Sequence, residues 1–391
     1  MVDGVCDERF GKVRDRFEAA FGRGDEVGAS VAVAIEGEMV VDLWGGHRDA
    51  GRSRVWTRDS LVKVASTSKA ITAFLAHVLM AEGRLDVDLP VARYWPEFAQ
   101  AGKGEVRVRQ LLSHTSGLCT WREPISFEDC ADWAKVTGLL AGQAPLWTPG
   151  ERNGYHMVTF GYLVGEVIRR ITGTSVGGYL RDVGGLLDLD MHIGAGPELD
   201  ARIADDVPDY GGQSAADVWG ATDPESIAVK TFTNPPAPAQ MTSAQRLRWR
   251  RMELPAGNAH TNARSIARMF AIYANAGMLD GARVLSPAVV AEAASVQSAT
   301  VDAVFGIEAQ FTLGFLRNQH GAVYGPNADA FGHSGTGGSF GCADPDCRLS
   351  MGYAPNRLLA GLAGDPRAIA LIDAVYECLG RGAAVDGPRI R

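Results

Sequence analysis

The stretch from residue 61 to residue 82, LVKVASTSKAITAFLAHVLMAE, decides both the fold and the place of the chemistry. From Lys69 to Glu82 the side chains leave little polar surface, which predicts a helix buried between two layers of structure. Ser66 and Lys69 open this helix, where positions three apart share one face and lie about 5 to 6 Å apart. A serine becomes nucleophilic when a base lies within hydrogen-bond reach, so Ser66 is a candidate nucleophile and Lys69 its partner. Unpaired backbone N–H groups at the helix start are suited to stabilise an oxyanion.

Two other serines have surroundings typical of a nucleophile. Ser60 precedes Lys63 by three residues, but the segment between them resembles a strand, in which positions three apart point to opposite faces. We therefore expect Ser60 in a turn. Ser339 lies in Gly-Gly-Ser-Phe-Gly, which matches the nucleophile elbow of α/β-hydrolases. That fold places its histidine after the serine, whereas all eight histidines here precede residue 339, so we expect Ser339 at a glycine-rich strand start.

Working outward, both ends of the chain carry sheet-forming sequence, and the middle, roughly 70 to 290, mixes helical patterns with irregular stretches. Asn262 is expected to cap one of these helices and Gly277 to end it. The segment 199–240 has no periodicity, and two interpretations stay open: a loop that walls a substrate cleft, or a flexible excursion. The patterns predict helices at 10–22, 69–82, 158–172, 263–276 and 368–379, and strands at 29–35, 39–44, 310–316, 322–324, 338–343 and 348–353.

Composition excludes several classes of protein. With 391 residues, 46% of them hydrophobic, the chain has enough apolar sequence for a large core. Lys and Arg number 38 against 46 Asp and Glu, a net charge of −8, so nucleic acid is not an expected partner. The basic run 246–251 is interpreted as a solvated helix face.

The sequence also predicts the compartment and the state of the cysteines. No apolar run approaches the roughly 18 residues of a membrane span, and residues 1–16 have charges in place of an apolar signal core, so we expect a cytoplasmic protein without a membrane partner. The six cysteines are expected to be reduced thiols. Cys342 and Cys347 do not have zinc-knuckle spacing, so packing is the preferred interpretation, and no metal or cofactor is expected.

Several motifs together resemble the serine β-lactamase-like family, and more narrowly the class C β-lactamase-like carboxylesterases, the family VIII esterases. The similarity covers nearly the whole chain. It implies an α+β fold, in which a mostly antiparallel sheet from both chain ends (1–65 and 290–391) is covered by helices beside an inserted, mainly helical domain (66–289). The active site would lie between the two domains. The motifs are Ser66-Thr67-Ser68-Lys69, Leu85 to Val91, Leu111-Leu112-Ser113-His114-Thr115-Ser116-Gly117-Leu118, Tyr155-His156 and Gly332 to Gly338, which includes His333-Ser334-Gly335.

The resemblance also implies roles for individual residues. Ser66 would be acylated, Lys69 would be its partner, and Tyr155 would be the second base that relays a proton to the leaving group. An ammonium at Lys69 would favour the phenolate and bring the pKa of Tyr155 down from about 10. The third motif would lie on the edge strand of the cleft, and the N–H groups of Thr336 and Ser66 would form the oxyanion hole. His114 is interpreted as a scaffold residue, and Trp121, Asn258 and His260 are left without a role.

Two departures from the β-lactamase pattern concern the substrate. His333-Ser334-Gly335 replaces Lys-Thr-Gly, so a fixed cation for a substrate carboxylate gives way to a residue mostly neutral at pH 7. Tyr155-His156-Met157 lacks the polar group of Tyr-x-Asn that could meet a substrate amide. Both changes favour a serine carboxylesterase acting on small neutral esters. The alternatives are a β-lactamase or DD-peptidase, an acyltransferase to a specific alcohol, and a non-catalytic binding protein; the oligomeric state stays unknown.

Overall fold

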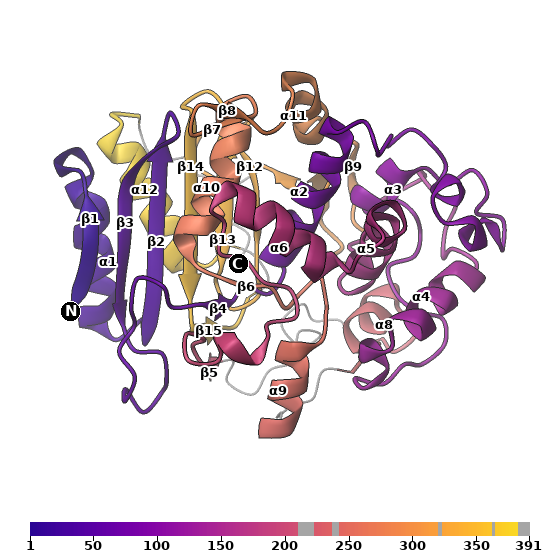
Figure 1. The fold of residues 1–391 in the computed structure, drawn as a ribbon, viewed down its shortest axis with the longest axis horizontal. Coiled ribbons are helices and arrows are strands. Elements are labelled where there is room, and N and C mark those ends of the chain that lie inside the picture. Colours follow the sequence, from indigo (N-terminus) through magenta and orange to yellow (C-terminus); the bar gives the residue numbers. More distant parts are fainter. Residues whose placement is uncertain (210–222, 237–241, 320–322, 362–363, 382–391) are drawn as a thin grey trace.

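A computed structural model describes residues 1–209, 223–236, 242–319, 323–361 and 364–381. Among these residues, nine strands form one antiparallel sheet with the order β1-β3-β2-β14-β13-β12-β11-β10-β9 (Figure 1). The sheet therefore consists of the two chain ends, as expected. Its strands are β1 (Val2–Cys6), β2 (Gly28–Ile35), β3 (Glu38–Gly46), β9 (Ser298–Val301), β10 (Glu308–Phe311), β11 (Leu316–Arg317), β12 (Phe331–Ser334), β13 (Phe340–Asp344) and β14 (Leu349–Pro355).

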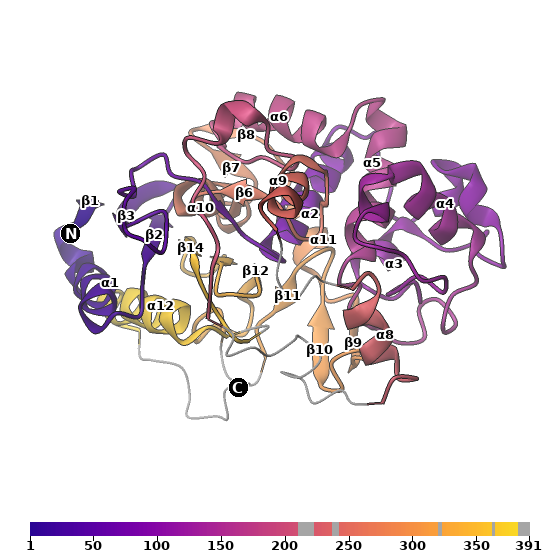
Figure 2. The same cartoon turned by 90° about the horizontal axis from the view of Figure 1, so that it is seen from below.

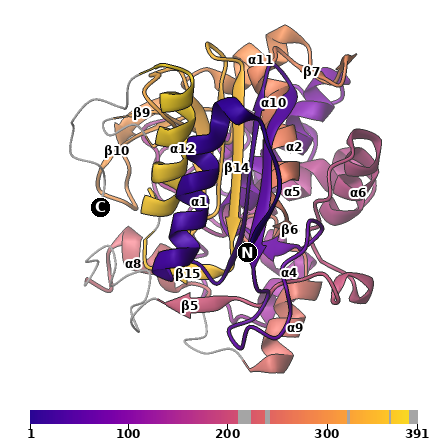
Figure 3. The same ribbon diagram turned by 90° about the vertical axis from the view of Figure 1, so that its left-hand side faces the viewer.

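Two terminal helices cover one face of the sheet. α1 (Gly11–Arg23) and α12 (Pro366–Cys378) lie side by side on it, as Figure 3 shows. Arg16 of α1 donates to the carbonyl of Ala370 in α12 at 2.9 Å. Phe17 of α1 and Tyr376 of α12 belong to one apolar core with the strands. The N-terminus and the C-terminal helix are thus fixed to the same layer.

The opposite face of the sheet is covered by α10 (Ala263–Ala274), which packs on β2, β13 and β14. Small residues make this close approach possible: Ala32, Gly352 and Gly341 are register partners across the three strands. A Cβ on Gly352 would lie 2.3 Å from the carbonyl oxygen of Ala263. The next register partner of Gly341 is His333, whose side chain therefore points to the same face.

The remaining helices lie beside α10 and extend away from β1 (Figures 1 and 2). Among them α2 (Thr67–Ala81) packs between β12 and the helices α5 (Thr159–Thr172) and α6 (Val176–Leu187), and its side chains are buried from Thr67 to Leu79. This burial confirms the helix expected between two layers. Around it also lie α3 (Val108–Leu112), α4 (Trp133–Gly142), α8 (Ile227–Thr233), α9 (Ser243–Arg251) and α11 (Pro287–Ala294). Short strand pairs complete the fold: β4 (Val62–Lys63) with β6 (His260–Thr261), β5 (Val207–Asp209) with β15 (Arg357–Leu359), and β7 (Met278–Leu279) with β8 (Ala282–Arg283).

Most predicted elements are found, with a few corrections. The hairpin of β2 and β3, the helices α1, α5 and α12, and the Asn262 cap, whose side chain accepts from Ser265 N at 2.9 Å, are confirmed. The single strand expected at 310–316 is wrong, because a turn divides it into β10 and β11. At 322–324, residue 322 lies outside the described residues and 323–324 form a turn. No strand is predicted at the position of β1.

The domain division needs one adjustment. α10 lies inside the range 66–289 expected for the helical insertion, yet it packs on the sheet. Its amphipathic pattern shows a buried face but not which layer buries it. We propose to keep the two-part division and to assign α10 to the sheet domain.

The close contact between α10 and the sheet predicts a stability effect. Gly352→Ala should lower the free energy of unfolding by about 1 to 3 kcal/mol, because the added methyl group meets the α10 backbone. Gly22→Ala in α1 is the matched control: its Cβ meets nothing within 4 Å, so the better helix former should raise stability by up to about 1 kcal/mol. Urea unfolding midpoints measure both, and a Gly352→Ala protein as stable as wild type would contradict the packing argument.

Candidate active site

Ser66 and Lys69 meet at the start of α2, as predicted. Nζ of Lys69 donates to Oγ of Ser66 at 3.1 Å and to the carbonyl of Ala256 at 3.0 Å. Ser66 is half-buried and Lys69 is fully buried. The preceding residue, Ala65, has φ +41°, a left-handed conformation that turns the chain from β4 into the helix. The serine is therefore held at the surface of the site, with the amine behind it.

The amine of Lys69 lies in an environment without a countercharge. No described carboxylate forms an ion pair with it, and burial holds its pKa well below the ordinary value of a lysine. A lowered pKa increases the share of neutral amine near pH 7, and only the neutral amine can accept a proton from Ser66. The expected contact between Ser66 and Lys69 is thus present, and the amine lies where it can accept this proton.

Tyr155 completes this group, although its ionisation differs from the expectation. Nζ of Lys69 lies over the Tyr155 ring, 4.7 Å from its centroid. Burial raises the pKa of Tyr155, and a hydrogen bond with Ser66 lowers it by less. The expectation that Lys69 would bring this pKa down is wrong, because the desolvation of a phenolate outweighs the favourable contacts. Tyr155 remains a protonated phenol that can donate to a leaving oxygen.

His333 lies opposite these residues, on β12. Its ring centroid is 6.3 Å from that of Tyr155, and burial, with Lys69 nearby, lowers the pKa of His333 to about 3. β12 is not the edge strand that was expected, because β11, β10 and β9 extend the sheet beyond it. However, β11 pairs only with Phe331 and Gly332. The end of β12 that carries His333 therefore still opens toward the site.

The turn after β12 contains Thr336, whose N–H is expected to be the second oxyanion donor. Gly335 N donates to Ser339 O at 2.8 Å, and Gly338 N to Gly335 O at 3.0 Å, which closes a compact turn around Thr336. Neither Thr336 N nor Ser66 N donates a hydrogen bond to another described residue. Two such N–H groups beside a serine are the arrangement that binds a tetrahedral oxyanion. Ser334, the other residue of the motif, is buried.

The competing serines have structural roles. Oγ of Ser339 donates to the carbonyl of Val64 at 2.6 Å and lies 2.9 Å from Oγ1 of Thr67, so it ties the start of β13 to the start of α2. Ser60 accepts from Thr57 N at 2.8 Å within a turn, and Lys63 forms an ion pair with Asp206. Both expectations from the sequence are confirmed.

Histidines surround Tyr155 as neutral scaffold residues. Nδ1 of His114 accepts from His156 N at 2.9 Å, and the His114 ring packs against that of Tyr155, 5.0 Å between centroids. His156 lies 2.8 Å from Oγ of Ser116 and 2.6 Å from the carbonyl of Gly154. Burial lowers the pKa of His114 well below its usual range and that of His156 to about 4. The scaffold interpretation of His114 agrees with these contacts.

Comparison with known proteins now identifies the relatives of this site. Residues 13–374 match the family model described as beta-lactamase. The chain belongs to the beta-lactamase family. Members of this family named below are serine hydrolases, and this chain is an enzyme of that class. The resemblance found in the sequence is confirmed.

Two curated proteins of the family are similar over most of their length. The esterase/beta-lactamase LipL of Mycobacterium tuberculosis (strain ATCC 25618 / H37Rv) is 31% identical over 369 residues, which cover 92% of this chain and 84% of that protein. Esterase EstB of Burkholderia gladioli is 30% identical over 390 residues, covering 90% of this chain and 91% of that protein.

Two solved structures have the same fold as this family member. A family VIII carboxylesterase is 42% identical, with a TM-score of 0.88, over 97% of this chain and 100% of that one. A penicillin-binding protein homologue from Caulobacter crescentus is 40% identical, with a TM-score of 0.87, over the same shares of the two chains. The β-lactamase/transpeptidase-like fold class expected from the motifs is confirmed.

In this beta-lactamase family member, apolar side chains next to Tyr155 form one wall of the site, which consists of Phe305, Phe232 and Met157. The Phe305 ring stacks on Tyr155 with 4.8 Å between centroids, and Phe232 of α8 lies 6.4 Å from Phe305. Met157, in the place of the missing polar residue, packs against the same cluster. The described part of the segment 199–240 thus walls the site through Phe232, whereas 210–222 and 237–240 lie outside the described residues.

The sequence does not show that Asn258 supports the site by fixing the loop that contains Ala256. Asn258 is buried; its Nδ2 donates to the carbonyls of Trp249 and Met252, each at 2.7 Å, and its Oδ1 accepts from Leu254 N at 3.0 Å. These bonds fix the loop that contains Ala256, whose carbonyl accepts a hydrogen bond from Nζ of Lys69. A buried asparagine just before a helix cap gives only a weak signal of this function.

The other residues left open do not reach Ser66. Trp121 is buried in the core, where Nε1 donates to Val136 O at 2.9 Å. His260 is buried on β6, where its backbone pairs with that of His192. The basic run lies in α9, which has no buried residue among those described, and Arg250 and Arg251 pair with Asp200. The solvated interpretation of the run is confirmed.

The unusual pKa values predict how the rate depends on pH. Lys69→Ala or Tyr155→Phe should lower kcat by about a hundredfold or more, as loss of a general base or acid does. Because the folded pKa of Lys69 is lowered, its amine is neutral above that pKa, so kcat/KM of the wild type should fall as pH decreases through it.

Kinetics with a neutral ester across pH 5 to 10 test this prediction. The acid limb should persist in the residual activity of Tyr155→Phe and vanish in that of Lys69→Ala. Lys63→Ala is the matched control, since Lys63 has the same spacing from a serine but pairs with Asp206, and it should keep the wild-type profile. A near-normal kcat in either site variant would remove that residue from the mechanism.

Proposed function

We propose that this beta-lactamase family member is a serine carboxylesterase that hydrolyses small neutral esters through an acyl-enzyme on Ser66. The observation that carries the proposal is the contact between Oγ of the half-buried Ser66 and a buried amine that forms no ion pair with a described carboxylate. The names of two similar proteins, both esterases, and of a carboxylesterase structure at 42% identity support the same reaction.

In this mechanism each residue has a defined step. The neutral amine of Lys69 takes the proton of Ser66 as Oγ attacks the ester carbonyl carbon, and the N–H groups of Ser66 and Thr336 hold the resulting oxyanion. Tyr155 gives its proton to the leaving alkoxide as the carbon–oxygen bond breaks, and the ammonium of Lys69 returns a proton to Tyr155. Water then attacks the acyl-enzyme along the same route and releases the acid. His333, Ser334 and Gly335 line the substrate side.

The surroundings of the site favour neutral substrates. Phe305, Phe232 and Met157 offer apolar contacts beside the group that protonates the leaving oxygen. His333 is neutral, so it offers a substrate carboxylate no fixed charge. An uncharged ester loses little hydration free energy when it enters such a pocket. An anion would lose much more, because no partner there replaces its hydration.

The alternatives share the serine and differ in the acceptor or the leaving group. A β-lactamase or DD-peptidase finds support in the penicillin-binding protein homologue at 40% identity. Against it, His333 stands where the Lys-Thr-Gly pattern of β-lactamases has its lysine. An acyltransferase would pass the acyl group to an alcohol in place of water. We place the enzyme in the cytoplasm, with a small-molecule ester as its partner. None of the described helices is long and apolar enough to cross a membrane.

The direct test is the release of nitrophenol from p-nitrophenyl acetate, butyrate and octanoate, with a chromogenic cephalosporin in parallel. Wild type should act on the short esters and only slowly on the cephalosporin, and Ser66→Ala should lose this activity. Ser339→Ala is the matched control; it removes the bond to Val64 and some stability, yet it should keep turnover. Normal turnover by Ser66→Ala, with loss in Ser339→Ala, would sink the proposal.

The neutral His333 predicts a change in substrate preference. His333→Lys should raise kcat/KM for benzylpenicillin relative to p-nitrophenyl acetate, because an ammonium can attract the penicillin carboxylate. The methyl ester of benzylpenicillin is the control substrate, since it has no carboxylate and should show no such gain. An unchanged ratio for benzylpenicillin would count against the carboxylate argument.

A further inference from the structure

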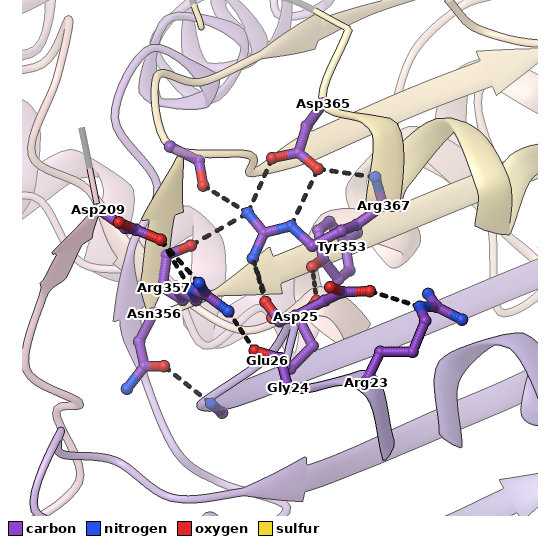
Figure 4. A network of polar contacts seen from close by, with 12 residues as sticks. Arg23, Gly24, Asp25, Glu26, Asp209, Tyr353, Asn356, Arg357, Asp365 and Arg367 are labelled. Carbon is purple, nitrogen blue, oxygen red and sulfur yellow. Dashed lines mark hydrogen bonds and ion pairs between the residues drawn. The ribbon is translucent and has the colours of Figure 1, made fainter. Parts of the chain in front are cut away.

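Behind the site, on the other side of the turn after β12, lies a buried polar network around Arg367 (Figure 4). Arg367, near the start of α12, has a side chain only 5% exposed. Its guanidinium binds Asp365 through Nε at 3.0 Å and Nη2 at 2.8 Å, and Glu26 through Nη1 at 3.0 Å. The hydroxyl of Tyr353, on β14, donates to Glu26. A desolvated arginine with two carboxylates is costly to assemble and is rigid once formed.

The same guanidinium reaches the turn that contains Thr336. Nη2 of Arg367 donates to the carbonyl of Gly337 at 3.0 Å, and it also donates to the carbonyl of Arg357 at 3.0 Å. The turn lies directly against the network, because a Cβ on Gly338 would be 2.4 Å from Oδ2 of Asp365 and 2.6 Å from Nη2 of Arg367. Position 338 therefore requires glycine, because the ion pair of Arg367 and Asp365 leaves no room for a side chain there.

The other side of the turn contacts the chain just before the nucleophile. A Cβ on Gly335 would lie 2.4 Å from the carbonyl oxygen of Val64 and 3.2 Å from Cβ of Ala65. Thr336 therefore lies in a four-residue turn held between the Arg367 network and the segment that leads into Ser66. Gly337 and Gly338 have φ +94° and +114°, conformations that glycine adopts freely, so the turn has little stiffness of its own. Contacts from outside must fix it.

We propose that Arg367 is a positioning residue for the oxyanion hole. Through its bond to the Gly337 carbonyl it fixes the turn, and so holds the Thr336 N–H where the oxyanion forms beside Ser66. This inference rests on the proposed acyl-enzyme mechanism and extends it to a residue that touches neither substrate nor nucleophile.

The position of one N–H matters most in the transition state. Removing a single oxyanion donor costs about 10²- to 10³-fold in kcat, and a displacement of about 1 Å can cost about 10²-fold. The ground-state ester binds mainly through apolar contacts, so a misplaced turn should lower kcat and leave KM nearly unchanged. A general loss of folded protein would instead lower the amount of active enzyme without changing its kcat per active site.

The test compares variants that act on this contact from both sides. Arg367→Lys keeps the charge but not the planar set of donors that joins Asp365, Glu26 and Gly337. Gly338→Ala keeps the arginine and places a methyl group against Arg367 and Asp365, so the turn and the network must move apart. Tyr353→Phe is the matched control, because it removes the bond to Glu26 within the same network but does not touch the turn.

The rates are taken with p-nitrophenyl butyrate and divided by the number of serines labelled by a fluorophosphonate. Arg367→Lys and Gly338→Ala should each lose at least tenfold in kcat, with KM within threefold. Affinity for phenylboronic acid, whose tetrahedral adduct with Ser66 places a hydroxyl in the oxyanion position, should fall by a similar factor. Tyr353→Phe should stay within threefold of wild type in all three quantities.

The inference is overturned if Arg367→Lys keeps kcat within threefold of wild type, or if Tyr353→Phe loses as much as Arg367→Lys does. If Arg367→Lys does not fold, Gly338→Ala decides alone, and a normal kcat there overturns the inference. Failure of the proposed function has a different signature: the wild type would then show no ester turnover or fluorophosphonate labelling that depends on Ser66.

Discussion

The close contact between the turn after β12 and the start of α2 is the constraint on which the rest of the site depends. Close packing sets this contact, because a Cβ on Gly335 would lie 2.4 Å from the carbonyl oxygen of Val64. The Ser339 hydroxyl, which donates to the same oxygen at 2.6 Å, adds only stability. This contact joins the sheet to the helical layer. Its two sides contain Ser66 and Thr336, whose backbone N–H groups donate no hydrogen bond to another described residue. In the proposed mechanism, a single packing contact therefore links the architecture of the fold to the stabilisation of an oxyanion.

The second governing feature is a buried site whose groups are mostly uncharged. Burial lowers the pKa values of Lys69, His114, His156 and His333 and raises that of Tyr155. An amine held neutral in this way is destabilising for the fold, because the unfolded chain would bind a proton there at pH 7. The benefit is a base that is ready to act near neutral pH. The site thus exchanges some stability for reactivity, as functional sites often do.

The two faces of the sheet contribute in different ways. On one face the small residues Ala32, Gly341 and Gly352 admit α10 closely, and His333 continues this row into the site. On the other face α12 carries Arg367 to the back of the turn. The proposed catalytic groups are therefore supported from both sides by rigid elements, and the apolar wall with Phe232 and Phe305 borders them.

The sequence by itself determined the local features of this protein. Periodicity located α1, α2, α5 and α12, the hairpin of β2 and β3, and the Asn262 cap, because these depend on near neighbours in the chain. The spacing of Ser66 and Lys69 on one helix face predicted their contact for the same reason. The family motifs drew attention to Tyr155 and to His333.

Only the tertiary structure decided the long-range features. The turn that separates β10 from β11, the interior place of β12 and the layer to which α10 belongs all depend on pairing between distant segments. The direction of the Tyr155 pKa shift could not be read from the sequence, since it results from how completely the folded chain excludes water. Neither could the roles of Asn258 and Arg367, because each acts through backbone carbonyls that come close only after folding. Sequence specifies which groups are present, but burial and contact, which set their chemistry, are properties of the packed whole.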